Sequence, residues 1–358
     1  MRIRRVLVPT VLALVVCVGG VPPGVAPRGG VAAEALGARL TDQEFWRLVT
    51  ELSEPDGNFR SDNLLSNETK FQYVIPTLSD IAKPGRAYLG VGPEQNFTYI
   101  AALKPRVAFI VDIRRGNLDL QLMYKALFEL SANRADFVSR LFSRRRPDGL
   151  TLTSTTAEIF AAYAKVEPSA ELYYENLKAI QNQLVVRHGF KLPAGDLTGL
   201  DYVYKEFFSF GPDVQYSSRG TFGGNYPTYG ELMVVTDTKG RPHGYLSSEE
   251  LFRVVKDLEA RNLIVPVVGN FAGPKAIRAV GRYLKQKDTI VSAFYLSNVE
   301  QYLKQDNVWD AFCANAATLP VDGTSLFIRS GRFGTAPGLS SELGTIEIEV
   351  GESCAPNR

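Results

Sequence analysis

Two glycines and an acidic residue form the pattern in this sequence that could bind a ligand. Gly90 and Gly92 follow a short β-rich run, a helical pattern begins at Glu94, and Asp112 ends the next apolar run. Glycines let backbone N–H groups approach a ligand closely, and a helix N-terminus favours a carboxylate or phosphate. A carboxylate about twenty residues beyond such a turn accepts hydrogen bonds from ribose hydroxyls. The spacing therefore predicts a site for a nucleotide-type ligand.

Three more polar residues are candidates for the same pocket. Asn67 and Glu68 lie just before the first strand and could close the pocket from its N-terminal side, with helix capping as the alternative. Asn270 follows a later strand, predicted to be central, at the sheet edge where open α/β folds bind ligands, although asparagine also caps turns. No catalytic residue can be assigned, because the only histidines, His188 and His243, both fit structural roles. So few histidines also predict no metal centre.

The positions of these residues depend on an alternation of β-rich runs and helical patterns. The predicted strands are 86–89, 106–111, 231–236, 262–269, 289–296, 325–329 and 345–350. Such alternation predicts an α/β fold with a doubly wound, mostly parallel sheet. The last two strands lack a long helix between them, so an antiparallel C-terminal edge is expected. A largely helical insertion at about 143–229 would cover the sheet's open edge or form part of a pocket.

The glycine turn and its acidic partner resemble the first two motifs of class I S-adenosylmethionine-dependent methyltransferases. The matching segments are LGVG at 89–92 and IVD at 110–112. The antiparallel edge suits the seven-stranded sheet of that family, and the resemblance covers about 63–112 and 231–350. Tyr88 and Glu94 depart from the family pattern, which usually has an acidic residue and often a glycine at these positions.

The resemblance implies S-adenosylmethionine as cofactor. Gly90 and Gly92 would line its methionine end, and Asp112 would hold its ribose, with Glu94, Asn67, Glu68 and Asn270 completing the site. The implied function is methylation of an unknown small-molecule or envelope-associated acceptor. The alternative is a non-enzymatic binding protein that keeps the fold but has lost or changed the cofactor site.

The first 35 residues predict a cleavable export signal. A basic start precedes an apolar run at 6–18, which is too short to span a bilayer securely, and small residues allow cleavage after Ala33 or Ala35. We therefore expect a periplasmic or secreted protein with a single domain at 36–358 and no stable membrane span. An uncleaved membrane anchor is the alternative.

Charge and cysteine content add two expectations. The formal net charge of +2 gives no sign of a nucleic-acid-binding surface. Cys313 and Cys354 are the cysteines left after signal removal, and an even pair in an exported chain predicts a disulfide, with two buried thiols as the alternative. Glycosylation sequons occur at Asn67 and Asn96, both in the proposed pocket region.

Overall fold

The computed structural model describes residues 37–217, 226–331 and 339–352. The described residues belong to one compact unit, Ala33–Arg358. The predicted signal and Cys354 lie outside them, so cleavage and the disulfide stay predictions. Among the helices in these ranges, none is both long and apolar enough to cross a membrane.

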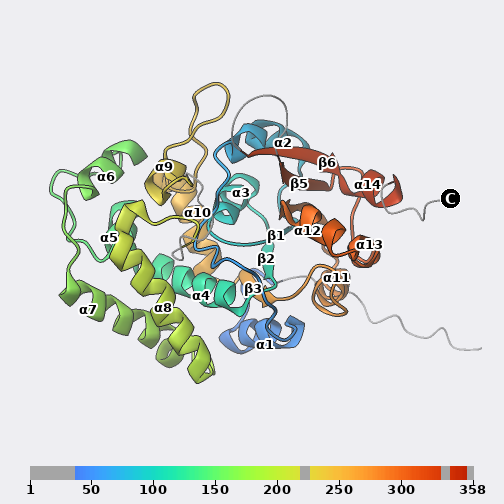
Figure 1. Ribbon diagram of the computed structural model, residues 1–358, viewed down its shortest axis with the longest axis horizontal. Helices are drawn as coiled ribbons and strands as arrows, with labels where there is room; N and C mark the ends of the chain where they lie inside the picture. Colours follow the sequence, from blue (N-terminus) through green and yellow to red (C-terminus); the bar gives the residue numbers. More distant parts are fainter. Residues whose placement is uncertain (1–36, 218–225, 332–338, 353–358) are drawn as a thin grey trace, which may run out of the picture. The chain divides into compact units, whose positions relative to one another are not determined.

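A six-stranded sheet with the order β3-β2-β1-β4-β5-β6 forms the centre of the fold (Figure 1). The strands are β1 (Ala87–Gly90), β2 (Val107–Asp112), β3 (Ile264–Val268), β4 (Val291–Ser297), β5 (Leu326–Gly331) and β6 (Ser340–Thr345). The first five are parallel, and β6 pairs antiparallel with β5. The predicted mostly parallel α/β sheet with an antiparallel C-terminal edge is confirmed.

Helices flank both faces of this sheet, which explains why β1, β2 and β3 are buried along their whole length. One layer consists of α3 (Gln95–Leu103), α4 (Arg115–Leu130) and α10 (Glu249–Ala260). The other consists of α1 (Asp42–Leu52), α11 (Ala276–Gln286), α12 (Val299–Gln305) and α13 (Trp309–Ala316). The short η1 (Phe71–Val74) and α2 (Ile75–Ile81) precede β1, and η1 packs against β6.

The segment at 143–229 is mostly helical in its described parts, 143–217 and 226–229, as predicted. It follows α5 (Arg134–Phe142) and contains α6 (Thr156–Tyr163), α7 (Ala170–Gln181), η2 (Asn182–Arg187), α8 (Ala194–Phe210) and η3 (Gly211–Asp213). These helices form a lobe on one side of the sheet, and α8 packs along α4 (Figure 1). These helices therefore extend the α4 layer.

The prediction of a strand at 231–236 is wrong, because these residues form most of α9 (Tyr229–Met233) and the turn after it. Thr228 and Glu231 make a capping box: Glu231 N donates to Thr228 Oγ1 at 3.2 Å, and Thr228 N donates to Glu231 Oε2 at 2.8 Å. This reciprocal cap starts a helix where the apolar residues alone suggested a strand. The sheet in the described ranges consequently has six strands, whereas the resemblance implies seven.

The last strand begins earlier than predicted. Residues 346–350 are in α14 (Ile346–Glu352), and the strand that pairs with β5 is β6, from Leu326 opposite Thr345 to Gly331 opposite Ser340. The β6 side chains are partly exposed and mostly polar, so no apolar run marks this strand in the sequence. Pairing with β5, which the sequence pattern does not reveal, decides its position.

Candidate functional site

A cavity of about 200 Å³ lies beyond the carboxyl ends of β1, β2, β3 and β4. Each strand contributes a lining residue at or just after its carboxyl end. These residues are, in the same order, Gly92, Ile113, Gly269 and Ser297. The chain passes from β1 to β2 and β3 on one side and returns to β4 on the other, which makes this the topological switch point of the sheet. Open α/β sheets bind ligands at this point.

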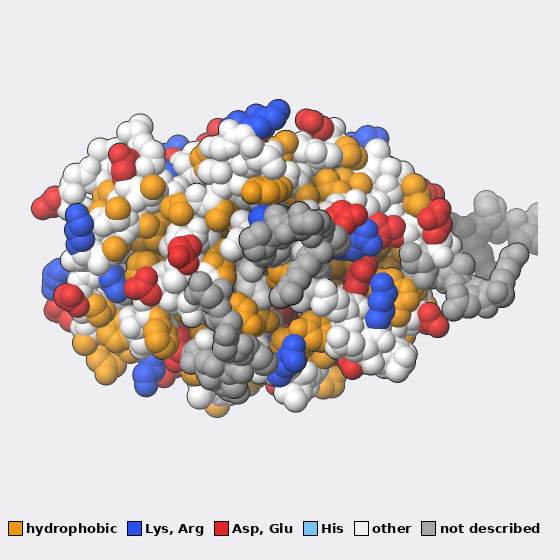
Figure 2. Space-filling view, turned by 45° about the horizontal axis from the view of Figure 1, so that its top comes forward, with side chains coloured by type: hydrophobic (Ala, Val, Ile, Leu, Met, Phe, Trp, Pro, Cys, Tyr) orange, Lys and Arg blue, Asp and Glu red, His pale blue; other side chains and the backbone are white. Residues whose placement is uncertain are grey.

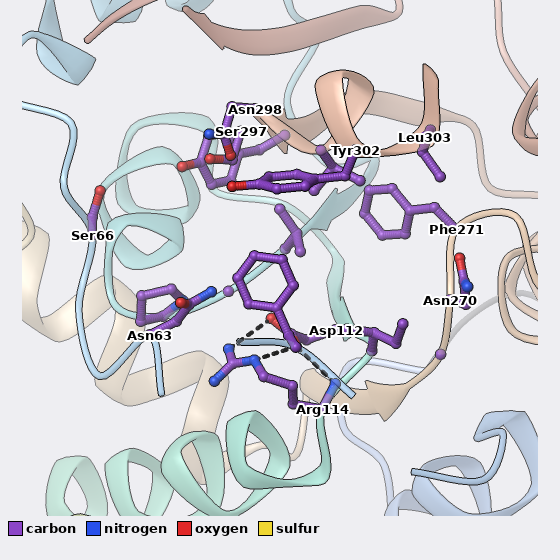
Figure 3. Close-up of a pocket in the computed structure, with 18 of the residues that line it drawn as sticks. Asn63, Ser66, Asp112, Arg114, Asn270, Phe271, Ser297, Asn298, Tyr302 and Leu303 are labelled. Atoms are coloured by element: carbon purple, nitrogen blue, oxygen red, sulfur yellow. Dashed lines mark hydrogen bonds and ion pairs between the residues drawn. The ribbon is translucent and has the colours of Figure 1, made fainter. Parts of the chain in front are cut away.

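The labelled residues surround the cavity on several sides (Figure 3). Asp112 and Arg114 lie along one side, and Ser297, Asn298 and Tyr302 lie along the opposite side. The aromatic lining residues are Phe59, Tyr216, Phe271, Tyr295 and Tyr302. Tyr216 lies in the segment predicted to be an insertion, so this segment contributes at least one side chain to the cavity lining.

The glycine turn borders the cavity through Gly92 rather than Gly90. Gly92 has φ +78°, a left-handed conformation that favours glycine, and it lines the cavity. Gly90 does not line the cavity. Instead, the Asn96 side chain lies directly against the Gly90 Cα and leaves no room for a Cβ. Asn96 Nδ2 donates to the carbonyls of Val91 at 2.9 Å and Pro93 at 2.8 Å, which fixes the turn. Asn96 is fully buried, so a glycan there is incompatible with this fold.

Asp112 lies at the cavity, as predicted, but it is paired with Arg114. Asp112 Oδ1 accepts hydrogen bonds from Arg114 N at 2.9 Å and Nε at 3.1 Å, and Oδ2 accepts one from Nη2 at 3.0 Å. The Asp112 and Arg114 side chains are 5% and 10% exposed, and Arg114 also donates to the Asp62 carbonyl. The carboxylate is therefore half of a buried ion pair instead of a free acceptor.

Asn67 and Asn270 both line the cavity. Asn270 follows β3, which is an edge strand of the sheet and not the central strand expected. Its side-chain oxygen accepts from Ala272 N at 2.9 Å, and its backbone N donates to Glu54 Oε2 at 3.0 Å. Asn270 thus stabilises the turn before α11, which was the alternative reading of this residue, and lies at one end of the cavity beside Phe271 (Figure 3).

Glu94 does not line the cavity. Its side chain is buried, and each carboxyl oxygen lies 3.2 Å from the backbone N–H donor of Ser66. Burial raises the pKa of Glu94 to about 8, with a smaller contribution from the negative charge of Glu68. Glu94 is therefore largely protonated at neutral pH and anchors the segment before β1 to the start of α3.

Glu68 also lies behind the cavity wall. It is 1% exposed, and five side chains donate hydrogen bonds to its carboxylate. They are Gln95 (2.8 Å), Tyr295 (2.7 Å), Ser297 (2.6 Å), Ser330 and Ser341 (3.5 Å). Two of the donors, Tyr295 and Ser297, line the cavity, so Glu68 contacts the site through them.

Sequence reasoning missed the β4 side of the cavity, including Ser297, Asn298 and Tyr302. Ser297 has φ +51°, and Asn63 on another side of the cavity has φ +47°. Left-handed residues other than glycine are uncommon and concentrate at functional sites. The available signal was the position of Ser297 and Asn298 directly after an apolar strand, the same argument that selected Asp112.

Neither histidine lies at the cavity. His188 contacts Asp42 and Glu129, each at 2.7 Å, and His243 Nε2 lies 2.9 Å from Asp237 Oδ2. Both therefore have the structural roles expected for them. Within 37–217, 226–331 and 339–352, no group of histidine, cysteine or acidic side chains could hold a metal ion.

Charged side chains of both signs are interspersed on the face shown in Figure 2. The described residues on that face form no broad patch of a single sign. Association with a polyanion uses a basic patch or stripe, and this face does not provide one.

The chain was compared with curated proteins and with models of protein families. No curated protein matches it. A family described as "Domain of unknown function (DUF7790)" matches residues 64–187 and 225–345, which include Gly92, Asp112, Asn270 and Ser297 but not Tyr216. Because these ranges cover more than half of the chain, the protein belongs to the DUF7790 family.

Proposed function

We propose that this protein binds an adenosine-containing ligand of the S-adenosylmethionine type in the cavity at the sheet's switch point. One observation carries the proposal. Gly92, whose backbone is in the left-handed conformation, and Asp112, the last residue of β2, line the same cavity. Backbone N–H groups beside a glycine can approach a polar ligand, and a carboxylate at the second strand can accept from a ribose.

Aromatic side chains support a ligand with a flat base. Phe59, Phe271 and Tyr302 line the cavity, and such rings favour stacked or edge-on contacts with another ring. The Asp112–Arg114 pair limits how the ribose is held. A carboxylate has about four acceptor positions, and Arg114 uses three, so Asp112 has room for about one ribose hydroxyl.

The reaction we propose is methyl transfer outside the cytoplasm to a small or envelope-associated acceptor. Methyl transfer depends mainly on positioning and desolvation, and it can proceed without a dedicated base. A non-enzymatic binding protein is the second candidate. One observation favours this candidate. Among the described residues, the acidic side chains that line the cavity are Asp112 and Asp306. Arg114 neutralises Asp112, and Asp306 is exposed, so neither is a buried, unpaired carboxylate that could serve as a base.

Calorimetric titration of the purified chain with S-adenosylmethionine and S-adenosylhomocysteine tests the proposal. We expect saturable binding, and Asp112→Asn should weaken it about tenfold, equivalent to one good hydrogen bond to a charged group. Asp237→Asn is the matched control, because Asp237 is also a buried carboxylate paired with an arginine, Arg241, but lies outside the cavity. No heat of binding at millimolar ligand would exclude the proposal. Binding without methylation of any offered acceptor would favour the second candidate.

A further inference from the structure

One corner of the cavity contains two hydroxyl groups whose protons are already used. Ser297 Oγ donates to Glu68 Oε1 at 2.6 Å, and Tyr295 Oη donates to the same oxygen at 2.7 Å. A hydroxyl has one proton and two lone pairs. Both residues line the cavity, so a hydrogen bond that either oxygen makes to a ligand there is one that it accepts.

The carboxylate behind this corner has no cationic partner among the described lysine and arginine side chains. Its five donors are neutral amide and hydroxyl groups. Burial, followed by the negative charge of Glu68, raises the pKa of Tyr295. The opposite side of the cavity differs, because there Arg114 neutralises Asp112. The Ser297 corner is the electronegative end of the site.

The N-terminus of α12 opposes the negative electrostatic potential at this corner, but its effect is smaller than that of the Glu68 carboxylate. This helix begins at Val299, directly after the corner, and a helix N-terminus has about half a positive charge. The buried Glu68 carboxylate lies only one hydroxyl group away from the cavity. Hydrogen-bond acceptors backed by a buried charge favour a cation even beside this short helix.

We propose that the corner formed by Ser297 and Tyr295 selects a positively charged group of the ligand, an ammonium or a sulfonium, through acceptors oriented by Glu68. This inference deepens the proposed function, on which it rests, by stating the charge of the ligand end that lies against β4. Glu68 is a positioning residue that acts through the two hydroxyls, because it does not line the cavity. The nearby rings of Tyr302 and Phe271 provide the apolar surroundings for the uncharged part.

Two small probes of the same shape test this inference without an adenosine ligand. Benzylammonium and benzyl alcohol are titrated into the wild-type chain and followed by NMR. We expect benzylammonium to bind about tenfold more tightly than benzyl alcohol. Glu68→Gln and Ser297→Ala should each reduce this ratio to about one to two, since one removes the charge and the other removes an oriented acceptor.

Ser341→Ala is the matched control, because Ser341 also donates to Glu68 but does not line the cavity, and it should keep the wild-type ratio. Ser297→Ala provides the answer if Glu68→Gln fails to fold. Equal affinities in the wild type, or an unchanged ratio in a folded Ser297→Ala variant, would overturn the inference. If the ratio depends on Ser297 but S-adenosylmethionine does not bind, the proposed function fails and the cation-selective corner stands. If S-adenosylmethionine binds but the two probes bind equally well, the proposed function stands and the cation-selective corner is disproved.

Discussion

At the scale of single residues, two neighbouring glycines serve different physical purposes. Gly90 is required because the Asn96 side chain lies against its Cα, whereas Gly92 is required because its backbone is left-handed. A Cβ at Gly92 would meet no atom within 4 Å. Packing explains one glycine and backbone conformation explains the other, although the sequence pattern treats them alike.

Substitutions at these glycines should separate the two causes. Gly90→Ala should destabilise the fold by about 1–3 kcal/mol through overpacking against Asn96. Gly92→Ala should cost about 1–2 kcal/mol for the left-handed backbone, and Gly92→Asn should cost less, because asparagine tolerates this conformation. Urea unfolding measures all three. Equal losses for the alanine and asparagine variants at Gly92 would show that its backbone is not the cause.

The buried pair of Asp112 and Arg114 gives a second prediction at this scale. Asp112→Ala should destabilise the chain by about 3–5 kcal/mol, because it leaves the Arg114 guanidinium buried without its partner. The double variant with Arg114→Ala should lose less than the sum of the single losses. Thermal and urea unfolding of the wild type, the two single variants and the double variant give the free energies for this double-mutant cycle. Additive losses would mean that the two side chains do not stabilise each other.

The sequence located part of the site and missed the rest for physical reasons. Gly92 and Asp112 could be found because the ends of adjacent parallel strands meet at one sheet edge. The pairing of Asp112 with Arg114 could not, since it depends on the side-chain conformation two residues further along. Glu68 was placed in the pocket on polarity alone. Only the fold shows that it lies behind Ser297, more than two hundred residues away in the sequence.

At the scale of elements, helix capping and strand pairing decided where the pattern was ambiguous. The apolar residues near 231–236 fit a strand, but the capping box of Thr228 and Glu231 makes a helix. The alternation of Ile346, Ile348 and Val350 also fits a strand, yet these residues form α14 and Ile348 is 55% exposed. The longer runs at β2, β3 and β4 were predicted correctly, because buried parallel strands have continuous apolar sequences.

A charged cluster joins three elements and predicts a pH dependence. His188, just after η2, contacts Asp42 of α1 and Glu129 of α4. Burial opposes both shifts, but hydrogen bonding between the two side chains lowers the pKa of Glu129 to about 2 and raises the pKa of His188 above 6.5. The Glu129 contribution to stability is lost as pH falls from about 4.5 towards 2. The His188 contribution is lost as pH rises above 6.5.

We therefore expect this cluster to stabilise the fold most between about pH 4.5 and 6.5. Urea unfolding across pH 3 to 9 measures the profile. His188→Ala should remove the decline above pH 6.5, because no imidazole remains to lose its proton. An identical alkaline decline in the variant would assign that decline to other groups.

The predicted disulfide belongs to α13. Cys313 is 4% exposed in that helix, and we expect it to be bonded to Cys354 near the C-terminus. Mass spectrometry of peptides prepared without reduction should find the linked pair. Cys354→Ser should then lower stability by about 2–4 kcal/mol, since a closed loop of this kind constrains the unfolded chain. Free thiols at both positions in protein purified from the exported fraction would disprove the bridge.

At the scale of the whole molecule, the predicted signal determines which chain is the functional one. A protein expressed from residue 1 in a host with an export pathway should lose about its first 33 to 35 residues. N-terminal sequencing of the mature protein should therefore begin at Glu34 or Leu36. Recovery of Met1 on the abundant form would favour the uncleaved anchor.

The strand order has a consequence for how the chain folds. The central strand β1 pairs with β2 nearby, but its other neighbour is β4, so that Ala87 lies beside Val291. During synthesis, one edge of β1 stays unpaired until β4 has left the ribosome, after the whole helical lobe has been made. Contacts of such long sequence separation are slow to form, and unpaired strand edges aggregate. If the predicted signal directs export, the chain must cross a membrane before it folds, and this delay keeps it from completing its core too early.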